Sequence, residues 1–148
     1  MNAKQKEAKA FLRQIYRCNA QILDYQKELE ELQEMATSIQ SPNLKSAVKT
    51  TSTKTDAKFV DYVTRIADCQ RELEQKMVQI LDLRWAVRSV IHQVPDNTLI
   101  LVLRYRYMDF MKWEDIAMKM DYSAKTIYKW HRAALDAVAD ILIKQTAA

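Results

Sequence analysis

The segment from Ser123 to Arg132 carries basic side chains at helical spacing, with no acidic residue among them. Lys125, Lys129 and Arg132 follow one another four and three residues apart, so a helix would place all three on one face. Cations grouped in this way attract the phosphate oxygens of a polyanion. The segment therefore predicts phosphate binding, and the elements around it must hold this face open.

Catalytic and metal-binding chemistry is not indicated by the sequence. No nucleophile and base, paired catalytic carboxylates or metal-ligand set can be assembled, and His92 and His131 have no cysteine or carboxylate at ligand spacing. The chain has no glycine, which removes the glycine-rich phosphate loops. We therefore expect a protein that is not an enzyme and uses no metal or cofactor. His131 is expected on the surface, facing phosphate.

The spacing around Ser123 predicts a helix-turn-helix. After Pro95, Asp96 can cap a helix over 98–107, and 108–112 forms a break. A second helix is expected over 113–120, followed by a turn at 121–122 and a third helix capped by Ser123. Ile127 and Trp130 then face inward, and the outer positions are predicted to bind DNA, with the N-terminal ones towards base edges and the basic ones towards phosphates. The predicted DNA-binding residues are Ser123, Ala124, Lys125, Thr126, Tyr128, Lys129, His131 and Arg132.

Two stretches of this region, LRYRY and WEDIAMKMDYSAKTIYKWHRAAL, resemble region 4 of the sigma-70 family. The layout of the whole chain is similar to phage-encoded sigma region 4-like regulators, including the ArpU and RinA-like late-gene activators. The resemblance covers about a third of the chain and implies a recognition helix that reads promoter DNA and controls phage or prophage transcription. Asp121 stands where the family has a turn glycine, and Asp enters the left-handed region more easily than most residues. The arginine-poor recognition helix gives no basis for transferring base preference, and no promoter-melting region is present.

Two heptad series precede this motif and predict coiled-coil helices. The linker between them is rich in Ser and Thr, with Ser41 and Pro42 able to open a turn and Thr55 or Asp56 able to cap the second helix. The series can pair as an antiparallel hairpin within one chain or merge in a dimer of four helices. The first series has Ala8, Ile15, Ile22, Leu29 and Ala36 at one core position and Phe11, Cys18, Tyr25, Leu32 and Ile39 at the other; the second has Phe59, Ile66, Leu73, Ile80, Val87 and Val94, with Val63, Gln70, Met77, Arg84 and Ile91.

The predicted fold is all-α: a long antiparallel coiled-coil hairpin over 1–94, with a flexible linker near 40–56, and a small trihelical helix-turn-helix domain over 95–148. With two distant cysteines, no apolar run of membrane-spanning length and a charged beginning, the sequence is typical of a cytoplasmic protein with no membrane partner. Charges balance at six of each sign over 1–40. The coiled coil is expected to space or dimerise the domain behind it.

The expected function is sequence-specific regulation of transcription, with double-stranded DNA as partner. RNA polymerase, contacted by the coiled coil, and a second copy of the chain are further candidate partners. Two alternatives share the same elements: a DNA-packaging protein like a phage terminase small subunit, which would form a closed ring, and a coiled-coil adaptor whose helical domain binds RNA polymerase.

Overall fold

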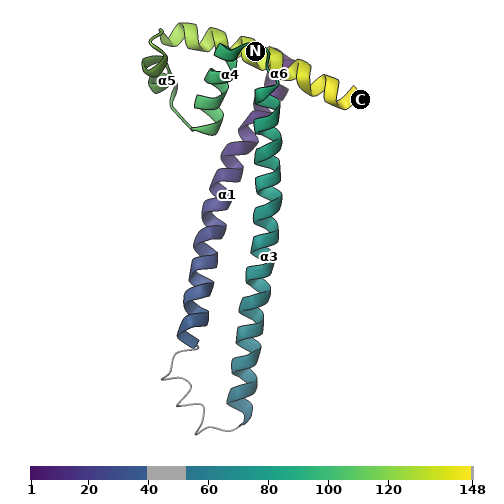
Figure 1. Cartoon of the computed structure of the whole chain (residues 1–148), viewed down its shortest axis with the longest axis vertical. Helices are drawn as coiled ribbons and strands as arrows, with labels where there is room; N and C mark the ends of the chain where they lie inside the picture. The colour runs from purple at the N-terminus through teal and green to yellow at the C-terminus, as the bar shows by residue number, and fades with distance from the viewer. Residues whose placement is uncertain (40–52, 148) are drawn as a thin grey trace. The chain divides into compact units, whose positions relative to one another are not determined.

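The computed structural model describes residues 1–39 and 53–147, in which every regular element is a helix (Figure 1). The predicted all-α class is confirmed. None of the described helices combines the length and the apolar character needed to span a bilayer. The elements are α1 (Ala3–Ile39), α3 (Thr53–His92), α4 (Asn97–Leu103), the π-helical turn η1 (Arg104–Met108), α5 (Trp113–Met120) and α6 (Ala124–Ala147).

The chain forms two compact units, and the first to consider is Ala20–Ile80. Within it, the α1 and α3 segments run in opposite directions (Figure 1). Ile22, Ile66 and Leu73 of the heptad series are buried, whereas Leu23, one position off the seam, is 58% exposed. This confirms the antiparallel coiled-coil hairpin, because the 3.5-residue repeat keeps one stripe of each helix turned towards the other.

The second long helix begins before the end of the predicted linker at 40–56. Residues 53–56 belong to α3, so Thr55 and Asp56 lie inside the helix that one of them was expected to cap. The predicted turn at Ser41 and Pro42 falls outside the described residues. Helices α1 and α3 are otherwise placed as the heptads predict.

The second unit combines Met1–Asn19 with Leu81–Ala148. The beginning of α1 and the end of α3 therefore pack with the C-terminal helices. These compact units differ from the predicted division at residue 95, and that division stays a prediction about functional domains. One core cluster joins α1, α3, α4, η1 and α6 through Ala8, Leu12, Ile15, Val87, Val90, Ile91, Val94, Leu103, Tyr107, Ala134, Leu135, Val138 and Ala139.

Polar contacts attach the beginning of α1 to α6. The Asn2 side chain accepts a hydrogen bond from the Gln5 amide at 2.9 Å, and the Gln5 side chain accepts one from the Asn2 amide at 3.2 Å, which is a reciprocal capping box. The Gln5 side-chain amide also donates to Asp136 at 3.0 Å, and Lys4 forms an ion pair with Asp140 at 3.0 Å. Because Asp136 and Asp140 lie on α6, the first turns of α1 are fixed to that helix.

A second, smaller core cluster supports the helix-turn-helix. Val102 of α4, Ile116 and Ala117 of α5, and Ile127 of α6 are buried together. Asp96 caps α4 as predicted, accepting hydrogen bonds from the amides of Thr98 and Leu99. The predicted single helix over 98–107 is instead α4 followed by η1, where the backbone widens.

Candidate nucleic-acid interface

The turn between α5 and α6 has the geometry that its residues predict. Helix α5 has the predicted bounds, and the residue that caps its C-terminus, Asp121, has a φ of 61° and a ψ of 45°, in the left-handed region. The Tyr122 amide then donates to the Ala117 carbonyl at 3.1 Å, which closes the end of the helix. An aspartate thus occupies a left-handed position, and Tyr122 and Ser123 separate it from the first residue of α6, Ala124.

Ser123 starts α6 as the predicted cap. Its hydroxyl oxygen accepts a hydrogen bond from the Thr126 amide at 3.2 Å and lies 2.9 Å from the Thr126 hydroxyl. This satisfies an amide that would otherwise lack a partner in the first turn. The cap fixes the direction in which α6 leaves the turn and thus the direction in which its outer face points.

That outer face is open within the unit. Ile127 is fully buried and Trp130 is packed against the smaller cluster, so both predicted inward positions face the core. Thr126 is half-buried. The remaining predicted residues, apart from His131, are exposed: Ser123, Ala124, Lys125, Tyr128, Lys129 and Arg132.

The expectation that His131 lies on the surface is wrong. It is 4% exposed, its Nε2 lies 2.8 Å from the Tyr107 hydroxyl, and its ring packs edge-on against Trp113 at 4.6 Å between centroids. His131 is four residues after Ile127, so it shares the inward face of α6. Charge patterning alone placed it with its basic neighbours, whereas the aromatic partners that cover it come from distant parts of the sequence.

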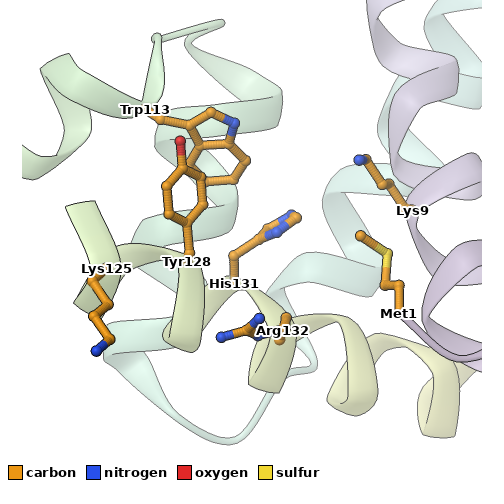
Figure 2. Close-up of a pocket in the computed structure, with 7 residues that line it drawn as sticks. All are labelled: Met1, Lys9, Trp113, Lys125, Tyr128, His131 and Arg132. Carbon is orange, nitrogen blue, oxygen red and sulfur yellow. The ribbon is translucent and has the colours of Figure 1, made fainter.

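Trp113, the first residue of α5, lines a hollow beside the open face of α6 (Figure 2). The Arg106 guanidinium lies 4.5 Å from its ring centroid, and the Tyr128 ring lies 5.3 Å from it. Arg106 also donates a hydrogen bond from Nη1 to the Met111 carbonyl at 2.9 Å, so its position is fixed. The hollow in Figure 2 is lined by Met1, Lys9, Trp113, Lys125, Tyr128, His131 and Arg132.

Positive charge surrounds this hollow. Burial first, and then the cations Lys9, Arg106 and Arg132, lower the pKa of His131 to about 4. Burial also raises the pKa of Tyr107 above its ordinary value. At neutral pH both partners are therefore uncharged, and the positive potential comes from the surrounding lysine and arginines.

Sequence reasoning missed Lys9 and Arg106 as members of this surface. Arg106 belongs to the LRYRY stretch, outside the predicted recognition helix. Lys9 lies on α1, where equal totals of acids and bases over 1–40 concealed an uneven distribution. Five of the six bases lie before residue 18, and five of the six acids lie after residue 23. A count over one helical face would have found this.

Comparison with known protein families assigns the chain to one family. Residues 39–139 match the family described as protein of unknown function (DUF1492). The chain belongs to this family. The DUF1492 match runs from the last residue of α1 into α6 and includes α5, the turn and the open basic face. The DUF1492 description carries no activity, so the resemblance to sigma region 4 stays a prediction; no curated protein and no solved structure matches the chain.

Proposed function

We propose that this DUF1492 protein binds double-stranded DNA through α5 and α6, with the first turns of α6 in the major groove. The observation that carries the proposal is the combination of a capped α6, buried Ile127, and exposed Lys125, Lys129 and Arg132 on the face turned away from the core. A helix diameter of about 10–12 Å fits the major groove, which is about 12 Å wide. Packing alone would not require this face to be free of acids from Ser123 to Arg132.

The residues on this face divide into two groups by reach. Ser123, Ala124 and Thr126 are short and occur at the beginning of α6, where base edges would lie. Lys125, Lys129 and Arg132 are long cations that can reach phosphates. Tyr128 packs against Trp113 and is 43% exposed, so its hydroxyl is available for a phosphate or sugar contact. This arrangement supports binding with both an electrostatic and a sequence-dependent component.

We further propose that DNA binding serves transcription regulation of phage or prophage genes, with RNA polymerase or a second copy of the chain as a further partner. This part rests on the likeness of LRYRY and the α5–α6 stretch to sigma region 4. Selection of bound sequences from a random duplex pool tests it, because a regulator enriches one motif. Recovery of unenriched sequences would contradict sequence-specific regulation.

The first prediction concerns Lys125 and Lys129. Changing both to Ala should weaken binding to a random 20-base-pair duplex about 10- to 100-fold at 0.1 M salt and reduce the salt slope by about 2, because two phosphate contacts are lost. The melting temperature should change little, since both side chains are exposed. Fluorescence anisotropy over a salt series, together with circular dichroism melting, measures both quantities.

The matched control changes Lys27 and Lys76 to Ala. Both are exposed lysines of the hairpin, so the net charge falls by the same amount away from α6. Equal losses in the two double variants, or no duplex binding by the unaltered protein even at low salt, would contradict the proposed interface. Light scattering on the same samples separates the packaging alternative, which would appear as a closed ring of many subunits.

A further inference from the structure

A second group of cations lies on the first turns of α1, and we call it the α1 basic face: Lys6, Lys9, Arg13 and Arg17. Their spacing of three and four residues puts them along one side of the helix. Lys6, Arg13 and Arg17 are exposed and Lys9 is half-buried, and no acidic residue occurs between Glu7 and Asp24. At 1.5 Å per residue, the face extends about 16 Å along the helix.

This face is continuous with the open face of α6. Lys9 lines the hollow of Figure 2 together with Arg132 and Lys125, and Figure 2 draws Lys9 on α1 opposite the α6 side chains. Two neighbouring hollows share Lys9 with it, and no acidic side chain lines any of the three. The second hollow is lined by Met1, Lys6, Lys9, Ala10, Arg13, Gln14, Tyr16 and Arg17, and the third by Lys9, Arg13, Tyr16, Arg106, Tyr107 and Trp113.

The two nearby carboxylates of α6 contact the first turns of α1 outside the α1 basic face. Asp136 accepts a hydrogen bond from Gln5, and Asp140 forms an ion pair with Lys4. These contacts fix the first turns of α1 beside α6 and engage the acids that could otherwise offset the basic face. The relative position of the two basic surfaces is thus set by packing within one compact unit.

We propose that the α1 basic face binds the phosphate backbone of the same DNA duplex that α6 engages, which extends the interface from the helix-turn-helix onto the first turns of α1. The inference rests on the proposed function. A span of about 16 Å covers several successive phosphates of one strand, which are spaced about 3.4 Å apart along the duplex axis. The proposed contact is independent of base sequence, because contacts to phosphates carry no sequence information.

A duplex fits this surface better than a single strand does. Single-stranded nucleic acids are held by exposed aromatic rings on which bases stack. The aromatic residue beside the α1 basic face, Tyr16, is half-buried, donates a hydrogen bond to the Arg106 carbonyl, and packs its ring against Tyr107 and Phe110. It is therefore not available as a stacking platform.

The test changes Lys6, Arg13 and Arg17 together to Gln in the full chain. These residues are exposed, and Gln is a good helix former. We expect about 100-fold weaker binding to a random duplex at 0.1 M salt and a salt slope smaller by about 2 to 3, as for three lost phosphate contacts. The control changes Arg65, Arg71 and Lys76 to Gln, which removes the same charge from residues paired with acids on α3, and it should retain the affinity and slope.

A charge-retaining variant, Lys6→Arg with Arg13→Lys and Arg17→Lys, should bind like the unaltered protein and keeps the test valid if the Gln variant folds poorly. Affinity and slope unchanged in the Gln variant, while Lys125 and Lys129 remain essential, would overturn the α1 contact and leave the proposed function standing. Failure of the unaltered protein to bind any duplex would overturn both. A larger loss for single-stranded RNA than for duplex DNA would also overturn the inference.

Discussion

At the scale of single residues, His131 is the position where charge and packing point in different directions. It stands between Lys129 and Arg132 in a basic stretch, yet its ring is enclosed by Tyr107 and Trp113. Protonation would place a cation in a buried site close to Lys9, Arg106 and Arg132. Burial and like charge both oppose this, so the neutral imidazole is the form compatible with the fold.

The pKa of His131 predicts an acid-sensitive fold. Its folded value of about 4 lies below its ordinary value of 6.5, so between these pH values the unfolded chain binds a proton that the folded chain excludes. The contribution of His131 to the free energy of unfolding is therefore present in full above pH 6.5. It falls by up to about 1.4 kcal/mol per pH unit as the pH drops towards 4. The variant His131→Gln lacks this pH-dependent contribution. Its loss of free energy of unfolding relative to the unaltered protein should therefore be smaller at pH 4.5 than at pH 7, by about 2 kcal/mol.

Urea unfolding at pH 7 and pH 4.5 measures this difference. His92→Gln is the matched control, because His92 is exposed and its removal should leave most of the acid dependence in place. Comparing each variant with the unaltered protein at both pH values removes the acid dependence that the variants share. A deficit for His131→Gln that is equal at both pH values would show that His131 does not exclude a proton.

At the scale of elements, the turn between α5 and α6 decides where the basic face points. Asp121 adopts left-handed backbone angles and ends α5, and Ser123, two residues later, caps α6. A left-handed conformation costs a residue with a Cβ atom roughly 1–2 kcal/mol, and glycine avoids this cost. The carboxylate of Asp121 also lies at the negative end of α5, where a cation would be preferred.

Asp121→Gly should accordingly stabilise the protein by about 0.5–1 kcal/mol. Asp109→Gly is the matched control, because Asp109 ends η1 with a φ of −99°, an angle that needs no glycine. There the substitution should lower stability, since glycine gives the unfolded chain more freedom. Denaturant unfolding of the two variants measures both changes. The same sign of change at both positions would contradict the backbone explanation.

At the scale of the whole molecule, the C-terminal helices depend on the two ends of the long helices for their core. Of the thirteen buried residues in the main cluster, six belong to α1 and α3, and a seventh, Val94, lies two residues after the end of α3. Each buried aliphatic side chain contributes about 1.5–3 kcal/mol, whereas a domain of this size is stable by only about 5–15 kcal/mol. The helix-turn-helix is therefore not expected to keep its core without them.

The fragment 95–148 should consequently melt without a cooperative transition, as measured by circular dichroism and hydrogen exchange. The comparison is a variant in which residues 24–77 are replaced by a short flexible linker, which keeps the main core cluster complete. We expect that variant to retain a cooperative transition close to that of the full chain. A cooperative melt of 95–148 alone would show that the smaller cluster around Ile116 and Ile127 is sufficient.

Much of the fold could be predicted because its signals are local or periodic. The heptads identified the buried seam through Ile22, Ile66 and Leu73, and the helix-turn-helix spacing gave the bounds of α5 and the cap at Ser123. The sequence predicted a break over 108–112, but the π-helical turn at Arg104–Met108 and the left-handed φ of 57° at Phe110 carried no such signal. Neither position has the glycine, proline or asparagine that marks an irregular backbone.

By itself, the sequence determined the helical class, the pairing stripe of the hairpin, the α5–α6 turn and the basic stretch on α6, because each depends on neighbours within a few residues. Only the tertiary structure decided that His131 is buried and that α1 lies beside α6. Those outcomes rest on contacts between residues as distant as Gln5 and Asp136, 131 positions apart, and Tyr16 and Arg106, 90 apart. Such contacts form through packing of whole elements, and no spacing within a single helix encodes them.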